Sequence, residues 1–240
     1  MPAANISISP IAEWIRRRVA SIALAGTGLL AATGAHAMSF ALELDDAGRK
    51  VVAARGVIEP GDAERLRKAL QAADRDAHGH RLLLLDSPGG TVVDAFALAD
   101  VVEAEKVATA VRRGRSCASA CAMIVFAAGA VRIVEPGGRL GVHTCYDRTT
   151  GSRVTSCNEA IAKAGEKHGV PFIATFTLMQ LTAPGSVRWL DAETAACWRL
   201  SNDPQPPPGR KPPPADPSGC TPPPAEAATG PALTPGARPR

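Results

Sequence analysis

The sequence predicts an α/β protein with repeated βαβ units and a mainly parallel sheet. The central part of the 240-residue chain alternates short apolar runs with segments of helical periodicity, which is the pattern of right-handed crossovers between parallel strands. The run from Leu82 to Leu85 has no polar alternation, which is typical of a strand covered on both faces. Hydrophobic residues make up 45% of the chain, so a buried core can form and a wholly disordered protein is excluded.

The expected elements follow in order along the chain. Strands or extended segments are predicted at 51–54, 57–58, 82–85, 107–111, 131–134 and 140–143. Helices are predicted over about 62–75, 91–104, 119–129 and 158–168, and a further helix begins at Ala192. Turns of glycine and small residues at 87–90 and 114–119 follow two of the strands. Ligands bind at the carboxyl ends of strands in such sheets, so these turns are the expected place for chemistry.

The first 37 residues have the pattern of an export signal. Arg16 to Arg18 precede an uncharged run of small and apolar residues, Val19 to Gly34, and Ala35-His36-Ala37 fits a signal peptidase. A membrane anchor is the alternative, but the run is shorter than the ~20 residues of a bilayer span. We expect residues 1–37 to be a signal peptide cleaved near Ala37. The protein would then be periplasmic or secreted, and membrane contact would require an uncleaved signal.

The last 38 residues are expected to lie outside the folded domain. Residues 203–240 contain 14 of the 21 prolines, and proline lacks the amide donor that helices and sheet ladders need. This predicts a disordered Pro-rich tail and leaves one domain at 38–202. Half of the net charge of +4 falls within the first 37 residues, which hold three Arg and one Glu. The remaining charge is too small for a nucleic-acid-binding surface.

Three local features point to chemistry. The Gly89-Gly90 pair stands between a strand and a helix, where free amides can bind a developing negative charge. Ser119 is flanked by alanines at a strand-to-helix junction, which leaves its hydroxyl accessible; packing within a small-residue helix is the other interpretation. His143 ends a predicted strand, and an imidazole can take the proton of a serine hydroxyl.

Together these features resemble the Clp-type serine peptidases of the Clp protease/crotonase-like superfamily, and most closely an exported, single-domain branch. The resemblance covers about residues 51–145, and the order Gly-Gly, Ser, His is its most specific part. It implies the Clp protease/crotonase-like fold. The segments that carry it are Arg55–Ile58, Leu84–Gly90, Ala118–Ala120, Ala127–Ala130 and Gly141–His143.

The resemblance also implies roles for single residues. Ser119 matches the nucleophile, His143 matches the general base, and the amides of Gly90 and Ala120 match the oxyanion hole. An extended peptide or protein substrate adds as a strand beside the glycine turn in this family, so Gly89 and Thr91 are expected to bind substrate. We expect no cofactor and no metal, because the sequence contains no phosphate loop of the Gly-x₄-Gly-Lys type and no His-Glu-x-x-His pattern. The resemblance makes a homo-oligomer plausible, because family members assemble into rings.

The chain departs from the family pattern in two places. The Ser119 helix is one residue longer, which keeps Ser116 as a rival nucleophile. The acid of the catalytic triad corresponds to a position near Val187, and a valine cannot orient an imidazole. Asp147 or Asp191 could supply the acid, although Asp191 more naturally caps the helix at Ala192. Otherwise the site is a Ser-His dyad or its catalysis is impaired.

All six cysteines lie after residue 37, which suggests disulfides. Cys145 and Cys157 flank a polar loop, and we predict that they pair and hold His143 in place. Cys117 and Cys121 bracket Ser119; they pair with each other or reach Cys157 or Cys197. The histidines of the polar loop His78-Gly79-His80 are expected in a solvated turn rather than as metal ligands.

Three functions compete at this stage. An exported serine hydrolase that cleaves peptide bonds agrees best with the Ser and His in family order. A non-catalytic peptide-binding or scaffold protein is the alternative, because the triad acid is missing. An acyl-CoA enzyme of the crotonase type would share the fold, but export makes CoA an improbable substrate.

Overall fold

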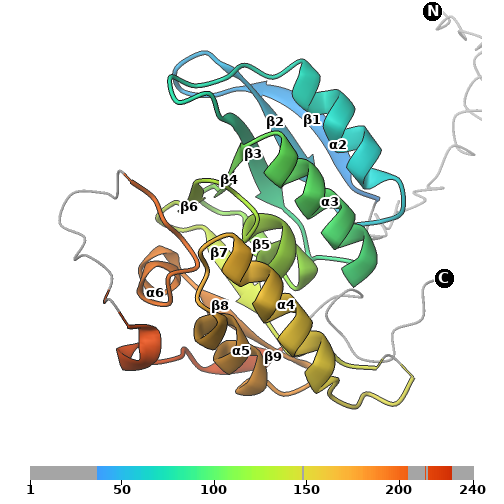
Figure 1. The fold of residues 1–240 in the computed structure, drawn as a ribbon, viewed down its shortest axis with the longest axis vertical. Helices are drawn as coiled ribbons and strands as arrows, with labels where there is room; N and C mark the ends of the chain where they lie inside the picture. The colour runs from blue at the N-terminus through green and yellow to red at the C-terminus, as the bar shows by residue number, and fades with distance from the viewer. Residues whose placement is uncertain (1–36, 148, 205–213, 215, 229–240) are drawn as a thin grey trace, which may run out of the picture. The chain divides into compact units, whose positions relative to one another are not determined.

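The computed structural model describes residues 37–147, 149–204, 214 and 216–228. The expected signal peptide lies outside these residues except for Ala37. The described fold is α/β, with two mixed sheets and helices between their strands (Figure 1).

The first sheet contains five strands in the order β1-β2-β3-β4-β6. These are β1 (Ser39–Leu44), β2 (Lys50–Arg55), β3 (Arg81–Asp86), β4 (Val107–Val111) and β6 (Arg132–Val134). β1 is antiparallel to β2, and the other neighbours are parallel. Helices α2 (Asp62–Gln71) and α3 (Val92–Ala104) form the crossovers from β2 to β3 and from β3 to β4, and lie side by side on one face of the sheet (Figure 1). The predicted βαβ pattern and mostly parallel sheet are therefore confirmed.

Apolar residues pack on both faces of the central strand β3. Leu83 and Leu85 belong to the main core, which also contains Leu66 and Leu70 of α2. Leu84 points to the opposite face and joins a smaller cluster there. This two-sided burial is the reason that the run has no polar alternation.

The second sheet has four strands in the order β5-β7-β8-β9. These are β5 (Ser116–Ala118), β7 (Arg139–Val142), β8 (Ser186–Leu190) and β9 (Ala225–Ala227). β5 and β7 are parallel, whereas β8 is antiparallel to both of its neighbours. A parallel bridge between Ser87 and Cys117 joins this sheet to the end of β3. The Gly-Gly turn and the Ser119 junction are thereby brought together.

A buried π-helix, η1 (Cys121–Phe126), follows β5 and packs against α3, α4, β5 and β7. All six of its residues are buried. The remaining helices are α4 (Thr155–Lys167), α5 (Phe172–Gln180), α6 (Ala192–Cys197) and the short 3-10 helix η2 (Pro217–Gly219). The small residues on either side of η1 allow this close packing in the middle of the domain.

Several elements differ from the sequence-based expectation. β1, β8 and α5 were not predicted, and β5 occupies part of the expected turn at 114–119. β5 is only three residues long and depends on its pairing with β7 and its bridge to Ser87. Such short strands are stabilised by distant partners rather than by their own sequence, so local patterns do not reveal them.

The expectation of a tail without any sheet ladder is wrong for residues 216–228. Residues 225–227 form β9 on the edge of β8, and Cys220 is buried in a disulfide with Cys197. The segment Ala225-Glu226-Ala227 contains no proline, so its amides can join a ladder although proline runs precede it. Most of the remaining tail, including 205–213 and 229–240, lies outside the described residues.

Three disulfides join the six cysteines in pairs. The predicted pair Cys145–Cys157 is confirmed. Cys117 pairs with Cys121, which was one of the open alternatives, and Cys197 pairs with Cys220. Disulfides persist in oxidising compartments, so the three bridges indicate an extracellular or periplasmic environment. No described helix combines the length and the apolar character that a membrane crossing requires.

We predict that the double variant Cys197→Ala/Cys220→Ala loses about 3 kcal/mol of unfolding free energy, because a disulfide with a separation of 23 residues restricts the unfolded chain. Urea unfolding of the oxidised protein measures the loss. The amides of β9 should also exchange faster with deuterium than those of β7. An unchanged urea midpoint would show that β8 holds the tail without the covalent link.

Candidate active site

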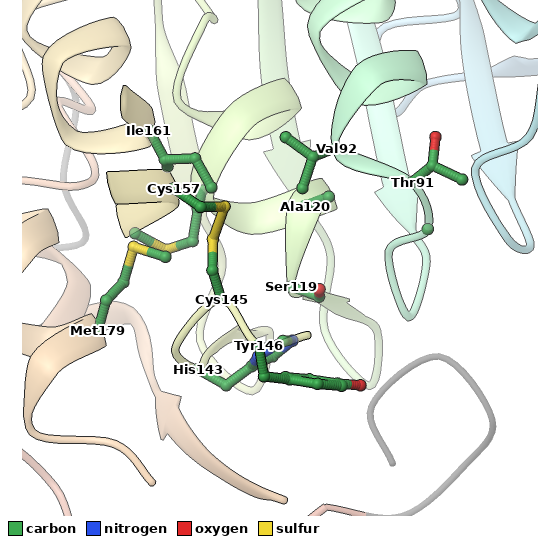
Figure 2. Close-up of a pocket in the computed structure, with 12 residues that line it drawn as sticks. Thr91, Val92, Ser119, Ala120, His143, Cys145, Tyr146, Cys157, Ile161 and Met179 are labelled. Atoms are coloured by element: carbon green, nitrogen blue, oxygen red, sulfur yellow. A yellow bond between two sulfur atoms is a disulfide. The ribbon is translucent and has the colours of Figure 1, made fainter. Parts of the chain in front are cut away.

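A cavity of about 270 Å³ opens at the carboxyl ends of the strands, and we call it the Ser119 cavity. Five of the six residues expected from the sequence to act in the site line this cavity, and they come from three different junctions of the fold. Figure 2 shows these residues with the apolar side chains around them. The lining consists of Gly90, Thr91, Val92, Ser119, Ala120, Met123, His143, Cys145, Tyr146, Cys157, Ile161 and Met179.

Ser119 lies in a left-handed turn between β5 and η1, with a φ of +58°. Its amide donates to the carbonyl of Gly141 at 2.8 Å, and its own carbonyl accepts from the amides of Ala122 and Met123. A left-handed conformation costs a non-glycine residue about 1–2 kcal/mol, so the surrounding contacts must hold it. Within the described part of the chain the Ser119 hydroxyl makes no hydrogen bond, which leaves it available to a ligand in the cavity.

The two glycines of the turn after β3 have different neighbours in the fold. Gly89 has a φ of +96°, and a Cβ there would lie 2.6 Å from Cβ of Ser119. Gly90 lines the cavity, and a Cβ at this position would lie 2.1 Å from the carbonyl oxygen of Ile58. Gly89 packs against Ser119. Its carbonyl accepts a hydrogen bond from the Ile58 amide at 2.8 Å. Gly89 is buried and does not line the cavity, so its expected contact with substrate stays a prediction.

The amides of Gly90 and Ala120 are free among the residues that the structure describes. Gly90 precedes α3 and Ala120 precedes η1, so both amides stand where helices leave their first donors unpaired. Two such amides beside a hydroxyl can bind an oxygen that gains negative charge. Thr91 also borders the cavity, but its hydroxyl caps α3 by accepting from the amide of Asp94 at 3.2 Å.

His143 follows the last residue of β7 and is 9% exposed. Its Nδ1 lies 2.7 Å from the carbonyl oxygen of Thr144. A carbonyl oxygen only accepts, so Nδ1 carries the proton and Nε2 keeps a lone pair. Nε2 is buried and has no hydrogen-bond partner in the described chain. Burial lowers the pKa of His143 below 6.5, although the hydrogen bond to Thr144 opposes this shift. The ring is therefore neutral at pH 7.

Neither of the two candidate acids left open by the sequence is hydrogen-bonded to His143. Asp191 caps α6 by accepting from the Thr194 amide at 2.8 Å, as expected. Asp147 accepts hydrogen bonds from the amides of Thr149 and Thr150. These bonds, chiefly the one from Thr150, hold the pKa of the Asp147 carboxyl below its usual range. Val187 is buried in β8. No carboxylate of the described residues is bonded to His143, whose Nδ1 partner is a backbone carbonyl that the sequence analysis missed.

The rival nucleophile Ser116 lies in β5, outside the lining of the cavity. It pairs with Arg139 in the sheet, and its amide lies 3.3 Å from Oδ1 of Asp86. The histidines 78 and 80 stand in a loop before β3 and do not line the Ser119 cavity; their ring centroids are 6.4 Å apart. Among the residues that the structure describes, no group of three His, Cys, Asp or Glu side chains could hold a metal ion.

Much of the cavity lining is apolar. Val92, Met123, Ile161 and Met179 contribute to it together with the Cys145–Cys157 disulfide, and no charged residue of the described chain lines the cavity. Tyr146 adds its ring, which lies 5.8 Å from that of His143. The sequence analysis named none of these side chains as site residues, although it predicted that the two cysteines pair and hold His143 in place. α4 and α5 bring Ile161 and Met179 to the cavity, whereas Val92 and Met123 come from α3 and η1.

A comparison of the sequence with protein-family models finds no match, and a search of curated proteins finds none either. Any proposal about the function therefore has to rest on the chemistry of the site. A free hydroxyl, a neutral imidazole with a bare Nε2 and two unpaired amides are the groups that nucleophilic attack on a carbonyl requires. No hydrogen bond joins Ser119 to His143 among the described residues; such bonds often tighten only when substrate binds.

We predict that Gly89→Ala displaces Ser119 and lowers the unfolding free energy by about 1–3 kcal/mol, because the new methyl group would overlap Ser119 and the Ala118 carbonyl. Gly114→Ala is the matched control, since Gly114 also has a positive φ but nothing within 4 Å of the added Cβ. Thermal unfolding measures both changes. Equal destabilisation of the two variants would show that backbone conformation, and not contact with Ser119, requires Gly89.

We predict that an NMR titration of the histidine rings gives His143 a pKa below 6.5. As the pH falls through 6.5, the unfolded chain takes up the proton before the folded one. The unfolding free energy therefore declines below pH 6.5 and levels off below the folded pKa. His143→Gln should lose this part of the pH dependence in urea unfolding. A midpoint at or above 6.5 would contradict the role assigned to burial.

Proposed function

We propose that the protein is an exported serine hydrolase of the Clp-like class that cleaves peptide bonds. The observation that carries this proposal is the meeting of Ser119, His143 and the amides of Gly90 and Ala120 around one cavity. These groups come from three junctions that lie far apart in the sequence. The three disulfides support a periplasmic or secreted location.

The proposed reaction begins with the attack of Ser119 Oγ on the carbonyl carbon of the scissile bond. The hydroxyl proton passes to Nε2 of His143, and the amides of Gly90 and Ala120 bind the oxyanion. Collapse of the intermediate breaks the C–N bond, and the leaving amine takes the proton from Nε2. Water then attacks the acyl-enzyme with His143 again as base, which releases the acid and restores Ser119.

The Thr144 carbonyl serves this reaction in place of the triad acid. By accepting from Nδ1 it keeps the tautomer whose Nε2 can take the Ser119 proton. A carbonyl is a neutral dipole and stabilises the imidazolium less than a carboxylate does. We therefore expect slow turnover from a Ser-His dyad; loss of the acid from a complete triad costs up to ~10⁴-fold in turnover.

The cavity supports an extended peptide with an apolar side chain next to the scissile bond. Its volume of about 270 Å³ and its wall of Val92, Met123, Ile161 and Met179 suit an aliphatic side chain. A charged side chain would find no partner there and would lose its hydration. Substrates with Leu or Met at this position should be cleaved before those with Asp or Lys.

Two further features support the Clp-like class. The crossovers of the five-stranded sheet and the chain order Gly-Gly, Ser, His agree with the resemblance. The extra residue in the Ser119 helix also has a physical counterpart, because η1 is a π-helix and takes up more residues per turn than an α-helix. Assembly into a homo-oligomeric ring belongs to the same proposal.

A peptide-binding protein without turnover is the second candidate. It is favoured by the absence of a carboxylate on His143 and of a Ser119–His143 hydrogen bond within the described residues. The same apolar cavity would then hold a peptide side chain. This candidate predicts equal affinity of wild type and Ser119→Ala for a peptide that neither protein cleaves.

We predict that a fluorophosphonate probe labels Ser119 and that Ser119→Ala abolishes the labelling. This substitution removes only the hydroxyl, since Ser and Ala meet the same backbone strain at a φ of +58°. Ser116→Ala is the matched control and should label as the wild type does. Mass spectrometry of the labelled peptide identifies the site. A wild-type protein that remains unlabelled and cleaves no peptide would reject the hydrolase and leave the binding protein.

A further inference from the structure

Asn158 is a fully buried polar residue in the first turn of α4, beside the candidate site. Its side chain is 0% exposed and uses both ends of its amide group. Nδ2 donates to the Thr144 hydroxyl at 2.9 Å, and Oδ1 accepts from the Cys145 amide at 2.7 Å. Both partners stand directly after His143 in the chain. Nothing in the proposed reaction has yet used this residue.

The two atoms that matter belong to one peptide unit. The carbonyl of Thr144 and the amide of Cys145 share a planar, trans peptide bond, so they point in opposite directions. Asn158 Oδ1 holds the amide end of this plane, and Nδ1 of His143 meets its carbonyl end at 2.7 Å. Fixing the amide therefore aims the carbonyl at the imidazole. The hydrogen bond to Oδ1 also polarises the peptide unit and makes its carbonyl a better acceptor.

The sheet does not supply this constraint. β7 ends at Val142, so the Thr144–Cys145 peptide lies beyond the ladder. Besides Asn158, two links tie Cys145 to the start of α4: its disulfide with Cys157, and its carbonyl, which accepts from the Val154 amide at 2.9 Å. Both links act on the side chain and the carbonyl of Cys145, and neither involves the atoms of the Thr144–Cys145 peptide group. Among the described side chains, Asn158 is the one that accepts a hydrogen bond from the amide of this peptide group.

From this geometry we infer that Asn158 is a positioning residue for His143: it fixes the Thr144–Cys145 peptide plane, whose carbonyl sets the tautomer of the imidazole. This inference rests on the proposed roles of Ser119 and His143. It assigns to a buried amide and a backbone carbonyl the orienting task that a carboxylate performs in a complete triad. A purely structural asparagine would affect stability and leave the imidazole unchanged.

The test measures the tautomer of His143 and the reactivity of Ser119 in the variant Asn158→Leu. Leucine is similar in size to asparagine but can make neither of the two hydrogen bonds. Asn158→Ala is the second variant, for use if Asn158→Leu does not fold, because the smaller alanine leaves room for water. In the wild type, ¹⁵N shifts at pH 8 should show the proton on Nδ1. In the folded variants a mixed population with the proton on Nε2 should appear. The rate constant of fluorophosphonate labelling should fall by about 10- to 100-fold, as expected for a misplaced catalytic group.

Asn202→Leu is the matched control, because the side-chain amide of Asn202 also makes hydrogen bonds to the backbone through both its oxygen and its nitrogen. Its Oδ1 accepts from the Arg132 amide at 2.6 Å, and its Nδ2 donates to the Ala130 carbonyl at 3.2 Å, away from the Ser119 cavity. This variant should keep the wild-type tautomer and labelling rate even where its stability falls. Folded Asn158 variants with the wild-type tautomer and labelling within twofold would overturn the inference. If the wild type is not labelled and cleaves no peptide, the hydrolase proposal fails, and the tautomer alone still decides the role of Asn158.

Discussion

The left-handed backbone at Ser119 is the constraint on which the site depends. Ser119 takes this conformation between β5 and η1 and lines the cavity. The conformation is held by the Gly141 carbonyl on one side and by Gly89 on the other, where any Cβ would overlap Ser119. The Cys117–Cys121 disulfide closes the same loop covalently. Strain of this kind persists only where surrounding structure over-determines it, and such positions cluster at functional sites.

Burial determines the charge state of His143, the second reacting group of the site. Loss of hydration favours the neutral imidazole, and a backbone dipole rather than a charge holds Nδ1 of His143. The arrangement keeps a base with a bare Nε2 at neutral pH without a buried carboxylate, which would itself be costly to desolvate. The peptide unit that makes this possible is held by Asn158, so the orienting function is spread over backbone and an uncharged side chain.

The C-terminal part of the chain contributes to the same construction. β9 pairs with β8, which pairs with β7, the strand that ends just before His143. The Cys197–Cys220 disulfide anchors the segment that leads to β9. A proline-rich region can therefore complete a sheet, provided that a short stretch with free amide donors reaches the edge strand.

The sequence by itself determined the crossovers of the first sheet, the glycine turn, the junction positions of Ser119 and His143, and the Cys145–Cys157 pair. Each of these has a local signature in apolar runs, small residues or spacing. Only the tertiary structure decided the second sheet, the pairing of residues 225–227 with it and the partner of the imidazole. β5 and β9 are three-residue strands that exist through distant pairing, and the group on Nδ1 is a main-chain carbonyl. Every residue carries such a carbonyl, so no residue pattern distinguishes the one that folding brings to His143.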